Sequence, residues 1–157
     1  MDLRKSSEAM ATSTSMELDT SLFPFVYTTF GEKPLADDEV SAFCETVHML
    51  ALRGPYFHLI DTTRQRTTLT PKQRLIIADW MGKPEAVARG GHRILDVIVI
   101  SHPLIRGALT AVYWLRPPAA PTKVVSTARE AIPFFEERAR AVGLEFSEAA
   151  RARLMRG

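Results

Sequence analysis

Seven consecutive residues near the middle of the chain, ILDVIVI at Ile94–Ile100, constrain the fold more than any other segment. Except for Asp96 they are all β-branched or aliphatic, and an almost uninterrupted apolar run is typical of a central strand covered on both faces. Such a strand belongs to a sheet with helices packed against it. The sequence therefore predicts an α/β domain whose central strand carries one polar residue, Asp96.

Strand-like and helix-like segments alternate along the rest of the chain. Short runs rich in aromatic and β-branched residues predict further strands at Phe25–Phe30, Tyr56–Asp61 and Lys123–Ser126, with Met16–Asp19 as a candidate partner of the first. Apolar residues spaced by three and four predict helices at Val40–Ala51, Pro71–Met81, from Ser101 to Leu115, and after Thr127, with another turn at Pro84–Arg89. This order predicts a single-domain α/β fold with a mainly parallel or mixed sheet of about four to five strands and helices packed on it.

Several helix starts carry specific signals. Thr70-Pro71-Lys72-Gln73 combines a capping threonine, a proline at the first helical position and the glutamine of a capping box. Thr127–Glu130 forms a second capping box, and Ser101-His102-Pro103 resembles a cap followed by proline. We expect Leu104 and Leu115 to face inward, and Pro133 to distort the final core helix because it falls beyond the tolerated first turn.

The chain's length and composition fit one globular domain: it has 157 residues, of which 46% are hydrophobic and 24% charged. Residues 1–15 lack the apolar core of a signal peptide and are expected to form a disordered leader. The predicted core domain spans 16–144, and residues 145–157 are expected to form a basic helix or tail. Gly90-Gly91 precedes a strand and is interpreted as a turn.

Several classes of function are disfavoured by the same composition. The net charge of +2 comes from interspersed charges without a dense basic stripe, so nucleic acid is not an expected partner. No apolar run is long enough to span a membrane, and the single Cys44 cannot form an internal disulfide, so a cytoplasmic location fits best. Cys44 lies on the apolar face of its helix and is expected to be a packed thiol.

Catalytic and metal-binding patterns are also missing from the sequence. The four histidines fall on different predicted elements without zinc-ligand spacing, and no nucleophile stands in a recognisable catalytic setting. The prediction is therefore a non-enzymatic protein without a cofactor or metal.

The most informative polar segment is FHLIDTTRQRTTLTPKQ at Phe57–Gln73, where a strand ends in Asp61 and a threonine-rich loop leads to the next helix. This places Asp61, Thr62 and Thr63 at the carboxyl edge of the predicted sheet, where open α/β folds usually bind their ligands. The alternative is a purely structural role, in which Thr70 caps the helix and the other threonines form hydrogen bonds with backbone groups of the loop.

Three arginines extend this candidate surface. If the loop after Asp61 and the helix after Ser101 share an edge, Arg64, Arg66 and Arg106 form a cationic rim able to hold an anion or an acidic partner. The alternative is that these arginines are scattered and solvated.

The chain resembles the SpoIIAA-like, or STAS-like, domains. YTTFGEKPLADDEVSAF resembles their second strand and first helix, FHLIDTT their strand ending in Asp, and LTPKQRLIIADWM the helix after it. VIVISHPLIRGALTAVYWL and PTKVVSTAREAIPFF resemble the remaining strand and helix pairs. The resemblance implies a non-enzymatic module that binds a partner protein, with Thr62 and Thr63 as the positions that match the family's phosphoacceptor hydroxyl.

Two functions from different classes follow. The first is a regulatory or scaffolding protein-interaction module, for which phosphorylation is a candidate control and whose oligomeric state the sequence leaves open. The alternative is a carrier or sensor of a small ligand, either a nucleotide or an apolar molecule. A deep pocket next to Asp61 favours the ligand-binding function, whereas a flat patch of aromatic and arginine residues favours the interaction module. Adjacent Tyr113 and Trp114 cannot both face the core, so one of them is a candidate contact residue.

Overall fold

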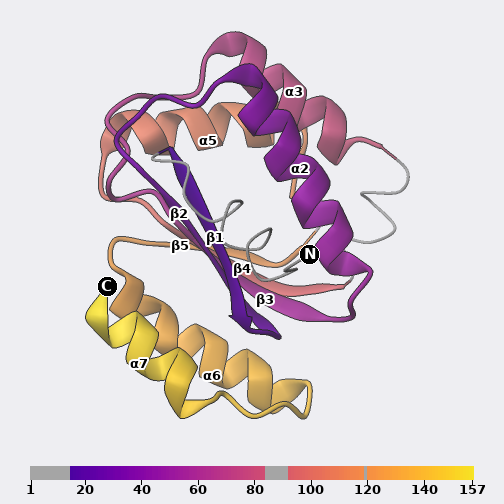
Figure 1. Ribbon diagram of the computed structural model, residues 1–157, viewed down its shortest axis with the longest axis vertical. Coiled ribbons are helices and arrows are strands. Elements are labelled where there is room, and N and C mark those ends of the chain that lie inside the picture. Colours follow the sequence, from indigo (N-terminus) through magenta and orange to yellow (C-terminus); the bar gives the residue numbers. More distant parts are fainter. Residues whose placement is uncertain (1–14, 84–91, 119) are drawn as a thin grey trace, which may run out of the picture.

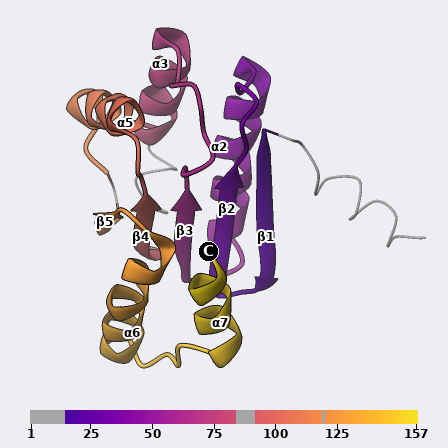
Figure 2. The same cartoon turned by 90° about the vertical axis from the view of Figure 1, so that its left-hand side faces the viewer.

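The computed structural model describes residues 15–83, 92–118 and 120–157, which form one α/β domain around a five-stranded mixed sheet. The predicted fold class is confirmed. The strands lie side by side in chain order (Figures 1 and 2), and they are β1 (Met16–Leu22), β2 (Phe25–Phe30), β3 (Tyr56–Asp61), β4 (Arg93–Val99) and β5 (Thr122–Val125).

The sheet is parallel except at one edge. β1 pairs antiparallel with β2, from Met16 opposite Phe30 to Leu22 opposite Phe25, which confirms the predicted partnership of these segments. The other three pairs are parallel, and His58 of β3 stands opposite Asp96 of β4. Each parallel pair therefore needs a crossover, and each crossover carries a helix.

Three crossover helices cover one face of the sheet. They are α2 (Asp37–Ala51), α3 (Pro71–Met81) and α5 (Pro103–Leu115). The three crossovers lead in one direction across the sheet, from β2 to β3, from β3 to β4 and from β4 to β5. Right-handed crossovers that all run in one direction place their helices on the same face of the sheet. Figure 1 shows these three helices on one side of the sheet.

The C-terminal segment covers the opposite face. A 3₁₀ turn η1 (Ala128–Ala131) leads into α6 (Ile132–Ala141), and α7 (Glu148–Arg156) returns beside it (Figure 1). Phe135 of α6 and Leu154 of α7 are almost completely buried in a cluster with Phe57 and Val97 of the sheet. α7 is thus part of the hydrophobic core, and β4 is covered on both faces as its sequence indicates.

The capping predictions hold in part. The Oγ1 of Thr70 accepts a hydrogen bond from the Gln73 backbone N at 3.1 Å, and the Gln73 side chain accepts one from the Thr70 backbone N, also at 3.1 Å. At α5 the cap is His102 rather than Ser101, since its Nδ1 accepts from the Leu104 backbone N at 3.1 Å.

Two other local predictions were wrong. Leu104 and Leu115 are 65% and 52% exposed, because α5 turns the face bearing Ile105, Ala108 and Val112 inward. Pro133 does not distort α6, because the preceding 3₁₀ turn moves the α-helical start to Ile132 and leaves Pro133 within the first turn, where proline is tolerated.

Some predictions fall on residues outside the described ranges. They are the leader before Ser15, the turn at Pro84–Arg89 and the glycine pair at 90–91. Within the described ranges, no helix has the length and apolar character needed to cross a bilayer.

Candidate ligand cavity

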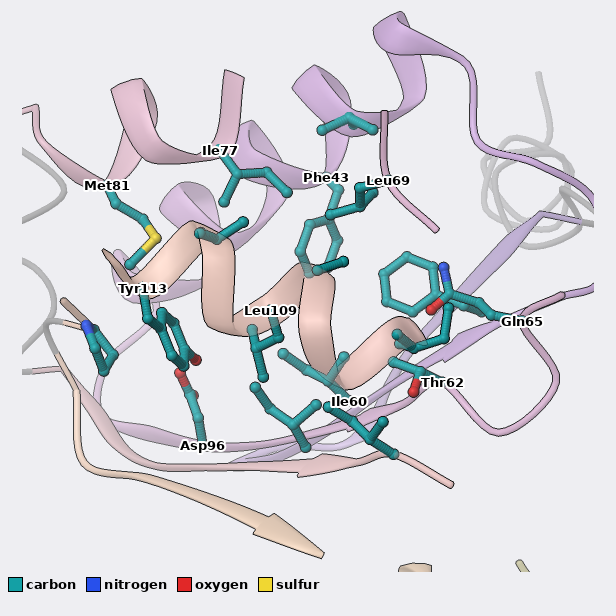
Figure 3. A pocket seen from close by; sticks show the side chains of 18 of the residues that line it. Phe43, Ile60, Thr62, Gln65, Leu69, Ile77, Met81, Asp96, Leu109 and Tyr113 are labelled. Atoms are coloured by element: carbon teal, nitrogen blue, oxygen red, sulfur yellow. The ribbon is translucent and has the colours of Figure 1, made fainter. Parts of the chain in front are cut away.

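An apolar cavity of about 160 Å³ lies between the sheet and its three crossover helices (Figure 3). Its walls come from α2, α3, α5, the floor strands β3 and β4, the end of β2 and the loops that follow β2 and β3. The apolar lining includes Phe30, Leu35, Val40, Phe43, Ile60, Leu69, Ile77, Trp80, Met81, Ile98, Ile100, Ile105, Ala108, Leu109 and Val112. Such a cavity, walled by aliphatic and aromatic side chains, is the usual form of a small-molecule site.

The position of α3 creates this space. α3 packs chiefly against α2 and α5 rather than against the strands, so it bridges the two helices above the sheet. The buried Gln73 fixes its start, because Nε2 donates to the Leu35 carbonyl at 2.7 Å and to Asp37 Oδ1 at 3.2 Å. The cavity therefore has walls anchored by hydrogen bonds as well as by apolar packing.

One end of the cavity is polar. Asp96 is only 4% exposed, and its Oδ2 accepts a hydrogen bond from Arg93 Nη1 at 2.7 Å. Its other oxygen, Oδ1, is buried without a hydrogen-bond partner among the described residues. Figure 3 shows Asp96 and Tyr113 facing one another at this end, from the sheet and from α5.

Burial controls the ionisation of this end. It raises the pKa of Asp96 to about 6, while the positive charge of Arg93 acts in the opposite direction. Burial, together with the negative charge of Asp96, raises the pKa of Tyr113 to about 12. At neutral pH the polar end therefore holds a carboxylate, a guanidinium and a neutral phenol.

A second buried polar pair adjoins Asp96 on the same face of the sheet. His58 and Thr28 are completely buried, and Thr28 Oγ1 lies 2.7 Å from His58 Nε2. Burial, together with the positive charge of Arg93, lowers the pKa of His58 to about 3, so the imidazole is neutral at physiological pH. Like Asp96 Oδ1, His58 Nδ1 has no hydrogen-bond partner within the described ranges. These two residues stand opposite one another on β3 and β4.

The predicted loop forms the opposite end of the cavity. Thr62 lines it and is buried, and its Oγ1 donates to the Val99 carbonyl at 2.7 Å. Thr63 donates from both its backbone N and its Oγ1 to Asp61 Oδ1, at 2.9 and 2.7 Å. Both hydroxyls thus stabilise the loop, and Thr62 would have to leave its hydrogen bond before it could accept a phosphate.

The three arginines lie outside the cavity. Arg64 is exposed, and Arg66 is exposed with its Nη2 3.8 Å from Glu32 Oε1, a weak surface pair. Arg106 is exposed on α5, where its Nη2 donates to the Ile100 carbonyl at 3.3 Å. The neighbouring Trp114 is 86% exposed and lines a shallow depression together with Arg106.

Tyr113 and Trp114 do not both face the core, as predicted from their adjacency: Tyr113 lines the cavity and Trp114 faces outward. Cys44 is buried, and burial raises the pKa of its thiol to about 12, consistent with a packed, unreactive side chain. In the parts of the chain that the structure describes, no group of three or more His, Cys, Asp or Glu side chains could hold a metal ion.

The polar end of the cavity was not among the sequence-predicted site residues. Asp96 stood out as the only interruption of ILDVIVI, and a carboxylate in such a strand is a signal, because Asp is rarely buried without a partner. Arg93 and Tyr113 carried no comparable signal, since their approach to Asp96 depends on how β4 and α5 pack.

No protein-family model, curated protein or solved structure matches this chain. Membership of the STAS-like family therefore stays a prediction.

Proposed function

We propose that this protein is a non-enzymatic carrier or sensor domain that binds a small apolar molecule in the cavity between the sheet and α2, α3 and α5. The observation that carries the proposal is the apolar cavity of about 160 Å³ whose lining includes Ile60 and Thr62, the residues on either side of Asp61. A pocket beside Asp61 is the feature that favours a ligand-binding domain over an interaction module.

The volume limits the size of the ligand. An apolar protein cavity of about 150 Å³ holds one benzene molecule. The present cavity therefore suits a compound with one ring or a branched hydrocarbon of similar size, and it is too small for a nucleotide. Of the two ligand classes considered from the sequence, the apolar molecule is the one proposed.

The test compares toluene binding by wild type and by Ala108→Leu, measured by calorimetry and by the rise in melting temperature. Ala108 lines the cavity from α5, so a leucine there fills part of the space while keeping a good helix former. We expect at least a tenfold loss of toluene affinity, because the three added side-chain carbon atoms occupy the ligand's volume. Bound ligand should raise the melting temperature of wild type in a concentration-dependent way.

The matched control is Gly107→Ala, one residue away on the exposed side of α5. A β-carbon at Gly107 meets no atom within 4 Å, and alanine in place of a helical glycine should stabilise the protein by about 0.5–1 kcal/mol. Toluene affinity should not change. If wild type fails to bind toluene and a panel of other single-ring hydrocarbons, the proposed function is wrong.

The second candidate, a regulatory interaction module in a cytoplasmic setting, is favoured by a separate observation. Trp114 is 86% exposed beside Arg106, and aromatic and arginine side chains are the residues that most often anchor protein interfaces. Arg64 and Arg66 offer further positive charge on the loop after β3.

Affinity capture with three baits tests this candidate: wild type, Trp114→Ser, and the double reversal Arg64→Glu/Arg66→Glu. The control bait is Arg140→Glu/Arg156→Glu, because these arginines are exposed on the C-terminal helices. A protein captured in stoichiometric amount by wild type and the control, but lost with either of the other two variants, supports an interaction module. Capture that is the same with all four baits contradicts it.

A further inference from the structure

We propose that the ligand is a neutral single-ring compound with one hydroxyl group, of the phenol class, and that this hydroxyl donates a hydrogen bond to Asp96 Oδ1. This inference rests on the proposed function, since it specifies the chemistry of a molecule bound in the same cavity. It follows from three observations on the cavity.

The first observation is the unpartnered oxygen. Asp96 is 4% exposed and lines the cavity, and its Oδ1 has no hydrogen-bond partner in the described part of the chain. A buried acceptor without a donor is destabilising, and the cost is larger for a charged group. A ligand that brings a donor to this atom therefore gains more than one that offers only hydrocarbon.

The second observation is the charge balance around that oxygen. Arg93 Nη1 lies 2.7 Å from Asp96 Oδ2, and both side chains are nearly buried, so the pair is electrically neutral as a whole. An ammonium group would leave a net positive charge in this apolar space, and a carboxylate would place a second negative charge against Oδ1. Uncompensated buried charges are costly, so a neutral donor is favoured over both.

The third observation is that polarity is confined to the two ends. Tyr113 stands beside Asp96, while the opposite end offers Thr62, whose hydroxyl is already donated to the Val99 carbonyl, and Gln65. Isoleucine, leucine and aromatic side chains line the space between these ends (Figure 3). One ring with one hydroxyl at the Asp96 end matches this distribution.

The experiment measures the affinity of wild type for four single-ring probes at pH 7.5: toluene, p-cresol, benzylamine and benzoate. They differ mainly in the polar group, which is absent, a neutral hydroxyl, a cation and an anion respectively. We expect p-cresol to bind at least about tenfold more tightly than toluene, because a hydrogen bond to a charged acceptor contributes this much or more. Benzylamine and benzoate should bind more weakly than p-cresol.

Asp96→Asn removes the acceptor with little change of shape. Arg93 still requires an oxygen facing it, so the amide oxygen should turn to Arg93 and the amide NH₂ should face the cavity. We expect the ratio of p-cresol affinity to toluene affinity to fall in this variant relative to wild type. Asp79→Asn, on the exposed side of α3, is the matched control and should keep the wild-type preference.

The outcomes separate the two proposals. If none of the four probes binds, both the proposed function and this inference fail. If toluene and p-cresol bind wild type equally, or if benzylamine or benzoate binds more tightly than p-cresol, the hydroxyl inference is overturned while the ligand-binding function stands. If Asp96→Asn fails to fold, the affinities of wild type for the four probes still test whether the ligand carries a neutral hydroxyl group.

Discussion

At the residue scale, the proposed ligand site depends on a carboxylate in the middle of an apolar strand. The sequence shows Asp96 plainly as the polar interruption of ILDVIVI, and general physical chemistry says that such a group needs a partner. It does not show that Arg93 satisfies only one of the two oxygens, because that depends on side-chain geometry three residues along a strand. The threonine-rich loop was the more conspicuous feature, but its Thr62 and Thr63 hydroxyls are held by hydrogen bonds within the protein.

Asp96 should give the protein a measurable pH dependence. Burial raises its pKa from an ordinary 3.8 to about 6, so the folded state holds this proton over a range where the unfolded state has lost it. That contribution to stability is present at low pH and is lost as pH rises through 6. Asp96→Asn lacks the titration, so its unfolding free energy relative to wild type should increase by about 2 kcal/mol between pH 4.5 and 7.5, since one pKa unit corresponds to about 1.4 kcal/mol.

Urea unfolding of both proteins across this pH range provides the measurement. His58 titrates in both and cancels in the difference, although its lowered pKa should make each protein less stable in acid. Stability curves that run parallel for wild type and Asp96→Asn would show that the folded state does not raise the pKa of Asp96.

At the scale of elements, local sequence signals placed most helices and strands correctly. Proline at the first helical position, a capping threonine and a glutamine three residues later identified the start of α3. The signals were weaker where two elements follow one another without a break. The 3₁₀ turn before α6 changed the position of Pro133 in its helix. Thr127 caps that turn rather than an α-helix, and the Glu130 side chain accepts from the Ser126 backbone N, so the predicted reciprocal capping box does not form.

Thr70→Ala tests the best-defined of these starts. Thr70 Oγ1 accepts from the Gln73 backbone N, and loss of such a cap costs about 0.5–2 kcal/mol. The unfolding free energy from urea titration should fall by that amount. Thr68→Ala, an exposed position in the same loop, is the control and should change stability by less than about 0.5 kcal/mol. Equal effects of the two substitutions would contradict a capping role for Thr70.

At the scale of the whole molecule, the alternation of strands and helices was enough to predict a single-domain α/β fold. The approximate number of strands, the pairing of β1 with β2 and the parallel crossovers follow from segment order and connection length. The cavity could not be predicted in the same way. It exists because α3 packs on α2 and α5 rather than on the strands, and amphipathic spacing shows that a helix has an inner face without showing what that face meets.

The C-terminal helix tests the unity of the domain. Leu154 of α7 is 1% exposed in the cluster formed with α6 and the sheet, so Leu154→Ala should destabilise the whole protein by about 2–5 kcal/mol. Thermal unfolding should remain a single transition at a lower temperature. The neighbouring Met155 is 45% exposed, and Met155→Ala should have a much smaller effect. A Leu154→Ala protein as stable as wild type would mean that α7 is not part of the cooperative core.

The most direct test of the ligand-binding account is a methyl NMR titration of the wild-type protein with toluene. Ile60, Ile98 and Ile105 line the cavity, whereas Val97 and Val99 project from the same sheet toward α6 and α7. We predict that the isoleucine methyl resonances shift in a saturable way while those of the two valines change little. Isoleucine resonances that do not move at saturating toluene, or shifts spread equally over both faces, would contradict a small-ligand site between the sheet and its crossover helices.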